Sequence, residues 1–475
     1  MTMTMTPPAA PRRRWLAPTA IGVIAVAMWF MPVPEGLTVP AWRLFTIFAA
    51  AIGSVVVNAV PILTASVISV ATAVLTGILS PAKAYAGFAN STILLIVLAF
   101  LVARAVVKCG LGARLGHVVI SLFGRSTLGL SYSIFLVDGL IAPAFPSNTA
   151  RSGVLYPLAY SLATASGATS GDGGRQRVGT FLMFSGIVSL SLSSALWLTA
   201  MAANPLGTEV ARAFGVDIAF GSWLVAASVP TLAAIALMPL VLRSLIAPEI
   251  DATPEAPAAA RRALAALGPL GRDERIVLIA FVGMVALWAS AATFKLDSTA
   301  VAFLGLGALL VSGVLTLEDI SKEGDVLATF IWFAVLFTLS NQLNELGFMG
   351  YLGQKLAGSL GGLSPIVAGL ALVVAYVLMH YVFVSQTAHL LALFGVFLDV
   401  GIRLGVPAAP LAFHLLFATN YFSAITPQGS SANLLFAGSG LVSQRDLYRI
   451  GGLATACHMV VYLVVGTPWL MFIWR

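Results

Sequence analysis

Long apolar runs recur along this chain and are separated by short polar stretches. Many of them approach the roughly 20 residues that a helix needs to cross a lipid bilayer. The clearest runs are Trp15–Val33, Ala41–Asn58, Ile62–Leu79, Thr92–Val107, Trp223–Leu245, Ile276–Ala292, Ala300–Leu315, Leu327–Leu339 and Leu453–Trp474. A membrane β-barrel would instead show alternating segments of about ten residues. The pattern therefore predicts an all-α, polytopic membrane protein.

The basic residues gather in the polar connections between these runs. They are Arg12, Arg13 and Arg14 before the first run, Arg175 and Arg177 in a Gly-rich loop, and Arg261, Arg262, Arg272 and Arg275 in a central polar stretch. Lys and Arg favour cytoplasmic connections, so the N-terminus, the Gly-rich loop and the central stretch are all predicted to be cytoplasmic. Only 9% of the residues are charged, and the net charge of +7 reflects this topology and not nucleic-acid binding. We expect a multi-pass protein of a bacterial inner membrane, with no cleaved signal peptide and no transit peptide.

Composition and motifs exclude several classes of protein. Cys109 and Cys457 are the only cysteines, so neither a disulfide framework nor a zinc site is indicated. The chain has no Walker motif, no HExxH, no CxxCH and no GxSxG. We expect no cofactor, no resident metal and no enzymatic activity.

Three landmarks occur in both halves of the chain, in the same order. GILS at 77–80 resembles GVLT at 313–316, KCGL at 108–111 resembles ELGF at 345–348, and SNTAR at 147–151 resembles SQTAH at 385–389. The spacing between the two copies is nearly the same for all three pairs, which indicates an internal duplication. We predict an N-terminal segment at 1–40 that holds the first transmembrane helix, a first repeat at 41–246, a cytoplasmic linker at 247–275 and a second repeat at 276–475. Two inverted repeats are typical of secondary transporters, in which the substrate binds where the repeats meet.

The third landmark predicts two re-entrant helical hairpins. Leu128–Phe145 is apolar but contains Asp138 and Pro143, and it ends in polar residues before it could comfortably span the bilayer. Irregular backbone at that depth is tolerated where it lines a water-filled cavity. Leu363–Val384 is long enough to span, so the second hairpin rests on the repeat alone. The predicted tips are Ser147, Asn148 and Thr149 in the first copy and Ser385, Gln386 and Thr387 in the second.

A polar break follows each hairpin, TAMAANP at 199–205 and TPQGSSAN at 426–433. Pro and Gly interrupt helices and free backbone groups for ligands. We therefore add Thr426 and Pro427 to the candidate site. The spacing from Thr199 to Thr426 is shorter than the spacing of the three landmarks, so this pairing is looser.

The chemistry of the two tips suits an anion. Hydroxyl and amide side chains offer donors and acceptors without charge, and a helix N-terminus behind them offers free N–H groups and a partial positive charge. Two such tips that face each other suit a molecule with an anionic group at each end, such as a dicarboxylate. Arg151 and His389 stand at equivalent positions, two residues beyond Thr149 and Thr387. Their charges could neutralise the two carboxylates of such a substrate. The alternatives are a structural pair of Arg151 with Asp138 and a buried core histidine at 389.

The strings PSNTARSGVLYPL, SQTAHLLALF and TPQGSSANLLFAGSG resemble the divalent-anion/sodium symporter family, and the similarity runs from about Ala41 to Trp474. The branch of 2-oxoglutarate/malate translocators and of citrate/succinate or tartrate/succinate antiporters is the nearest match. The resemblance implies a homodimer whose protomers each contain a scaffold domain and a transport domain that moves like an elevator. It also implies that the substrate carboxylates lie near the two tips. In the sodium-coupled branch, each Ser-Asn-Thr tip helps to form a sodium site.

This sequence departs from the sodium-coupled pattern at the second tip. Gln386 is one methylene longer than the Asn of the family pattern, and TPQG at 426–429 replaces a Thr-Pro-Pro-Asn type of turn. We therefore predict a sodium-independent exchanger of C4 and C5 dicarboxylates. A Na⁺-coupled dicarboxylate or citrate symporter is the alternative, and an ion channel or an integral-membrane enzyme is less favoured. An empty site with fixed positive charge is costly to carry through a membrane, which favours obligatory exchange.

Overall fold

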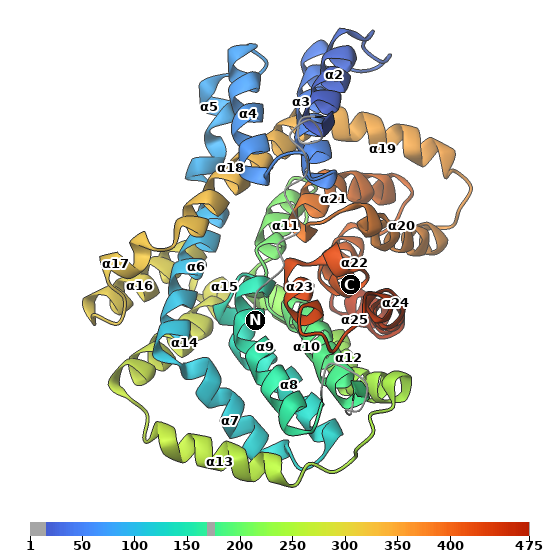
Figure 1. Cartoon of the computed structure of the whole chain (residues 1–475). Coiled ribbons are helices and arrows are strands. Elements are labelled where there is room, and N and C mark those ends of the chain that lie inside the picture. Colours follow the sequence, from blue (N-terminus) through green and yellow to red (C-terminus); the bar gives the residue numbers. More distant parts are fainter. Residues whose placement is uncertain (1–15, 169–175, 475) are drawn as a thin grey trace.

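The computed structural model describes residues 16–168 and 176–474, and it is helical throughout (Figure 1). Over the described residues, β-structure is limited to one isolated bridge between Ser126 and Ala252. Eight helical stretches among them are long and apolar enough to cross a membrane. The prediction of an all-α, polytopic membrane protein is confirmed. Arg12, Arg13, Arg14, Trp15 and Arg175 lie outside the described residues.

One group of helices packs together at the top and left of Figure 1. These helices are α2 (Leu16–Phe30), α3 (Val39–Val56), α4 (Ile62–Leu75), α6 (Ser91–Cys109), α14 (Arg272–Ala289), α16 (Ser298–Val311) and α18 (Gly324–Glu345). Short elements connect them, namely α5 (Pro81–Ala84), η1 (Ala86–Ala89), α15 (Ala291–Phe294) and α17 (Leu317–Ser321). We call this group the first bundle. It contains most of the apolar runs that the sequence reveals.

A second bundle surrounds helix α10 (Gln176–Leu196), whose residues from Val178 onward are all buried. The sequence pattern misses α10 as a separate span, because its serines and glycines interrupt the apolar run. Small residues let helices approach closely, and at Gly186 a Cβ atom would lie 2.4 Å from Phe436. The other helices of this bundle are α8 (Thr127–Ile141), α9 (Asn148–Ala165), α11 (Ala203–Arg212), α12 (Phe220–Ile246), α20 (Pro365–Met379), α21 (Gln386–Arg403), α22 (Ala408–Tyr421), α23 (Ser431–Ala437), α24 (Gln444–Val461) and α25 (Thr467–Ile473).

Two amphipathic helices join the bundles, α7 (Leu111–Phe123) and α19 (Phe348–Ser359). Each follows a glycine in the left-handed region, Gly110 with φ +78° and Gly347 with φ +85°. A residue with a Cβ is strained there, so these glycines allow the sharp turn out of α6 and α18. The second landmark pair of the sequence is therefore a pair of glycine turns. Helix α13 (Glu255–Leu267), in the central polar stretch, packs along α7 (Figure 1).

Two helical hairpins lie at the predicted positions in the second bundle, and their re-entrant character stays a prediction. In the first, α8 ends in a 3₁₀ turn, η2 (Ala142–Ala144), and the chain reverses into α9. In the second, α20 ends in η4 (His380–Val382) and the chain reverses into α21. The inverted-repeat relation between the halves stays a prediction.

The two polar breaks also have matching hydrogen bonds. The first separates α10 from α11 through η3 (Leu198–Ala200), and the second separates α22 from α23 through η5 (Phe422–Ala424) and η6 (Pro427–Gly429). Asn204 Nδ2 donates to the carbonyls of Ser194 and Trp197, ten and seven residues earlier. Asn433 Nδ2 donates to the carbonyls of Ser423 and Thr426, again ten and seven residues earlier. Because the bonding is the same, Asn204 corresponds to Asn433. This correspondence differs by two positions from the alignment that pairs Thr199 with Thr426.

Candidate functional site

A cavity of about 440 Å³ lies where the two hairpin tips meet. All six predicted tip residues line it, Ser147, Asn148, Thr149, Ser385, Gln386 and Thr387. The tips also touch directly, since Asn148 Nδ2 donates to Gln386 Oε1 at 3.1 Å, although the two residues are far apart in the sequence. The structure therefore brings together the two motifs that the sequence pairs.

Two helix N-termini point at this cavity. Ser147 is the N-cap of α9, where its Oγ accepts from Ala150 N at 3.3 Å, and Ser385 caps α21 in the same way through Ala388 N. The caps leave the first two N–H groups of each helix without an intrahelical acceptor. These groups and the two helix dipoles favour negative charge at the tips. The cavity therefore offers two anion-favouring ends without a cation in its lining among the described residues.

The two polar breaks complete the lining from behind. Met201 and Ala202 line the cavity from the first break, and Ser430 and Ser431 line it from the second. Ser431 Oγ lies 2.6 Å from Thr149 Oγ1, which ties the second break to the first tip. The sequence reading names the second break but selects Thr426 and Pro427 from it. These two do not line the cavity, because the short turn η6 carries the chain past them to Ser430.

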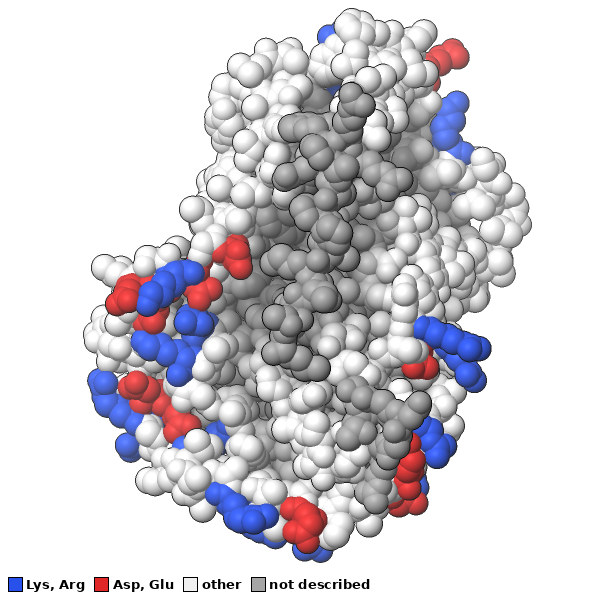
Figure 2. Space-filling view, viewed as in Figure 1, with Lys and Arg blue, Asp and Glu red and all other residues white. Residues whose placement is uncertain are grey.

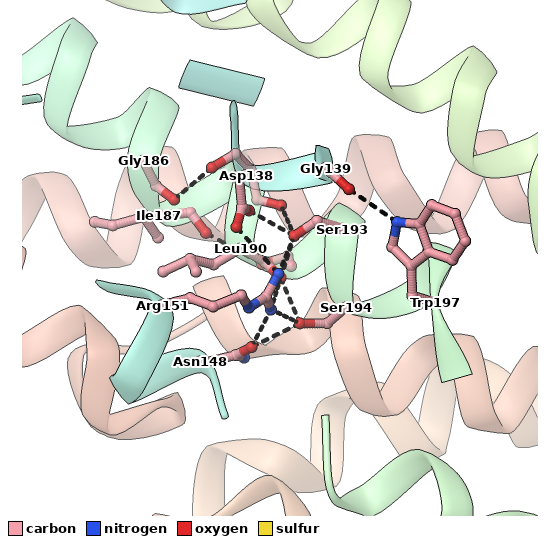
Figure 3. A network of polar contacts seen from close by, with 12 residues as sticks. Asp138, Gly139, Asn148, Arg151, Gly186, Ile187, Leu190, Ser193, Ser194 and Trp197 are labelled. Atoms are coloured by element: carbon pink, nitrogen blue, oxygen red, sulfur yellow. Dashed lines mark hydrogen bonds and ion pairs between the residues drawn. The ribbon is translucent and has the colours of Figure 1, made fainter. Parts of the chain in front are cut away.

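Arg151 is not among the residues that line the cavity, and Figure 3 shows it in a network of polar contacts with Asp138, Asn148, Ser193 and Ser194. Its guanidinium is fully buried and forms an ion pair of 3.1 Å with Asp138, which is also fully buried. The same guanidinium donates to Asn148 Oδ1 at 2.6 Å and to the hydroxyls of Ser193 and Ser194 on α10. Ser193 Oγ in turn donates to Asp138. Asp138 is the carboxylate partner that the burial of the Arg151 charge requires. A contact between Arg151 and the substrate stays a prediction.

His389 also lies outside the cavity lining. It is fully buried among the rings of Tyr376, Phe383 and Phe422, whose centroids lie 4.4 to 4.8 Å from its own. Its Nδ1 lies 3.3 Å from Nδ1 of His380, and the Nε2 of His380 donates to the carbonyl of Gly429. A neutral His380 must then accept at Nδ1, so His389 carries its proton on Nδ1. This aromatic packing is the arrangement of a core histidine.

The second tip is anchored by backbone carbonyls. Gln386 Nε2 donates to the carbonyl of Thr419 at 2.7 Å, and that of Asn420 lies at 3.4 Å. Both carbonyls belong to the end of α22, beside the second break. The extra methylene of Gln386 lets one amide reach Asn148 and α22 together. Each tip amide is therefore already engaged by protein groups.

The opposite wall of the cavity comes from the first bundle, and the sequence reading misses it. Phe100 of α6 and Thr329, Trp332 and Phe333 of α18 line this wall. No landmark marks these residues, since they belong to ordinary apolar runs. The described residues contain no group of three or more His, Cys, Asp or Glu side chains that could hold a metal ion.

This geometry defines a class of protein. Two broken helices and two hairpins that enclose a polar cavity inside a multi-pass helical protein are the architecture of a secondary transporter. The chain from residue 12 to residue 475 matches the model of the sodium:sulfate symporter transmembrane region. The chain belongs to this family, which is the divalent-anion/sodium symporter family that its motifs resemble. It is thus a member of a transporter family and not of an enzyme family.

Named relatives cover almost the whole chain. It is 40% identical to the Bacillus subtilis (strain 168) protein named "Putative malate transporter YflS", over 96% of this chain and 95% of that protein. It is 36% identical to "Dicarboxylate transporter 2, chloroplastic" of Spinacia oleracea, over 95% and 81%. It is 30% identical to the L-tartrate/succinate antiporter of Escherichia coli (strain K12), over 96% and 97%. The crystal structure of the Alcanivorax borkumensis YdaH transporter is similar with a TM-score of 0.59, 16% identity and 98% coverage of each chain, which supports the fold alone.

Proposed function

We propose that this protein exchanges C4 and C5 dicarboxylates across a bacterial inner membrane, without sodium. One observation carries the proposal. Two helix N-termini, at Ser147 and Ser385, converge on one cavity, and the side chains of the two tips there are polar and uncharged. A molecule with a carboxylate at each end matches two such N-termini. The printed names of the relatives, which include a dicarboxylate transporter and an L-tartrate/succinate antiporter, support the same substrate class.

The bonding of the tip amides supports independence from sodium. Sodium prefers oxygen ligands, and Asn148 and Gln386 contribute amide oxygens to the lining of the cavity. Asn148 Oδ1 already accepts from Arg151 and from Ser194, both at 2.6 Å. Gln386 Oε1 accepts from Asn148. A sodium ion would have to displace these donors, one of which is a cation.

We propose that Arg151 acts as a positioning residue and not as a substrate ligand. Its charge is balanced by Asp138, and it fixes the side chain of Asn148, which in turn contacts Gln386. His389 would serve the second tip through packing against Tyr376. The neutralisation of a dianion is then left to the two helix N-termini and to the hydroxyls around them.

The arrangement of the bundles supports an elevator motion. Both tips belong to the second bundle and face a wall of the first, and α7 and α19 join the two. Glu323 and Asp325 at the start of α18 line the cavity, and because Asp325 is exposed we call this end of the cavity its mouth. Arg272, at the end of the central linker, donates to the carbonyl of Ser312 just before α17, so the mouth and the linker share one side of the membrane. With a cytoplasmic linker this conformation is inward-facing, and each subunit of the proposed homodimer would contain one such site.

Counterflow in proteoliposomes tests the proposed function. The purified protein should take up labelled succinate or malate only into vesicles that are preloaded with a dicarboxylate, and a sodium gradient should not change the rate. Sodium-driven net uptake into vesicles without internal dicarboxylate would instead establish the symporter. A conductance without counter-substrate would establish a channel. The Gln386→Ala variant is the matched loss-of-site control, because it should fold but lose the contact between the tips.

A further inference from the structure

The cavity has an electrostatic asymmetry that its tips do not explain. The tips and breaks contribute only uncharged side chains, whereas the opposite wall contributes two carboxylates, Glu323 and Asp325. These two are the only charged residues in the lining among the described residues. Both stand at the beginning of α18, at the mouth of the cavity. An anion that occupies the cavity therefore lies near both carboxylates.

The two carboxylates differ in their partners. Glu323 lies 3.1 Å from the guanidinium of Arg104, so its charge is balanced. Asp319, one turn earlier in the chain, is balanced as well, since the ammonium of Lys108 at 2.6 Å holds the pKa of that carboxyl well below its usual value. Asp325 is exposed and has no ion pair within the described ranges. Among the described residues, the mouth therefore has one unbalanced negative charge, that of Asp325.

The pocket at the other end of α18 does not repeat this arrangement. In Figure 2, Lys, Arg, Asp and Glu gather along the edges of the molecule in mixed clusters. At the far end of α18, a smaller pocket of about 320 Å³ contains Glu209 and Arg212, which pair with each other at 2.8 Å. The amides of Asn341 and Gln342 supply the α18 side of that pocket. The unbalanced acid thus stands at one end of the wall only.

We infer that Asp325 is a specificity-determining residue that selects against substrates with a third negative charge. This inference rests on the proposed function and deepens it from anions in general to dianions. The repulsion between Asp325 and a bound anion grows in proportion to the charge of the anion. The helix N-termini at the two tips can each accept one carboxylate, and a third carboxylate has no such end. Asp325 adds a direct cost for that third charge.

The expected size of this effect follows from Coulomb's law. In a water-filled mouth, a unit charge roughly 10 Å away changes binding about twofold for each charge on the ligand. The removal of Asp325 should then improve the binding of a dianion about fourfold and that of a trianion about eightfold. The ratio of the two affinities, which is the measure of selectivity, should change about twofold. Charge reversal should change it about fourfold.

Glutarate and tricarballylate test the inference, because they share a carbon chain and differ by one carboxylate. Their dissociation constants are measured on the purified protein by isothermal titration at pH 8 and low ionic strength. Asp325→Asn should lower the ratio of the tricarballylate constant to the glutarate constant about twofold, and Asp325→Lys about fourfold. In 0.5 M salt, the differences between the variants should vanish, because the Debye length then falls to a few ångströms.

The matched control is Asp273→Asn, which removes the same charge from the first turn of α14 and lies outside the cavity lining. Its ratio should equal that of the wild-type protein. An unchanged ratio in both Asp325 variants would overturn the inference, as would an equal change in Asp273→Asn. The exchange assay is run in parallel with the same proteins. Selective binding without exchange would refute the proposed function alone, whereas exchange without a change in selectivity would refute the inference alone.

Discussion

The two hairpin tips have nearly the same sequence and the same caps, but the fold anchors them by different chemistry. The first tip is held by a buried ion pair, in which Asp138 balances Arg151 and Arg151 holds Asn148. The second tip is held by neutral contacts, in which Gln386 donates to a carbonyl of α22 and His389 packs among aromatic rings. The difference teaches that a charged residue near a binding site can hold the side chains that line the site in place without touching the ligand.

The comparison also explains why the tips diverge in sequence. A buried guanidinium requires a carboxylate partner, and α8 supplies it at Asp138. When the two tips are aligned, the position of α20 that corresponds to Asp138 is Tyr376. Its ring packs edge-on against His389, and its hydroxyl shares a hydrogen bond of 2.9 Å with Thr419. The partners therefore change together, since an Arg without Asp, or an Asp without Arg, would leave an unbalanced buried charge.

The largest effect is expected from breaking the ion pair of the first tip. Arg151→Ala leaves Asp138 buried without its partner, which should destabilise the fold by about 3–5 kcal/mol and abolish exchange. Thermal unfolding in detergent, followed by tryptophan fluorescence, measures the loss. The double variant Asp138→Leu with Arg151→Met should recover most of the stability but not the exchange, because Asn148 still lacks its charged donor, Arg151. A stable and active Arg151→Ala would show that the ion pair has neither role.

A smaller effect is expected at the second tip. Gln386→Asn shortens the side chain by one methylene, so the amide can no longer reach Asn148 and the carbonyl of Thr419 together. The loss of about one hydrogen bond should cost about 1 kcal/mol and raise the KM for succinate about fivefold. Gln354→Asn, the same change at an exposed position of α19, is the control and should have no effect on KM. If Gln386→Asn acquired sodium-driven uptake, the length of this side chain alone would exclude sodium.

The smallest effect is expected from an ion pair near water. Arg114 of α7 donates to Glu274 through Nε at 2.6 Å and Nη2 at 2.9 Å, at the linker side of the molecule. Arg114→Met should cost about 1 kcal/mol or less at low salt, because a pair near the surface keeps part of its hydration. The cost should shrink in 0.5 M salt, whereas the cost of Arg151→Ala should not. An equal salt dependence for both variants would mean that water reaches the Arg151 pair.

Much of the fold and part of the site could be predicted from the sequence. The apolar runs locate helices such as α6 and α12, and the paired motifs locate both tips, because these features are local patterns of burial and helix breaking. The central helix α10 could not be found in this way, because its serines make the sequence look polar although they are buried. Their hydroxyls donate to backbone carbonyls one turn earlier, as Ser185 does to Phe181. Ser430, Ser431 and the α18 wall could not be found either, because their roles depend on contacts with distant segments.

The sequence by itself determined that this is a multi-pass helical protein with two anion-favouring tips. Helix length, apolar content and caps such as Ser147 act within a few residues, so they can be read along the chain. Only the tertiary structure decided which polar groups face the cavity. Arg151 and His389 stand almost as close to their tips in sequence as Asn148 and Gln386 do, yet they turn inward, because Asp138 of α8 and the aromatic rings around α20 offer them better partners than the cavity does.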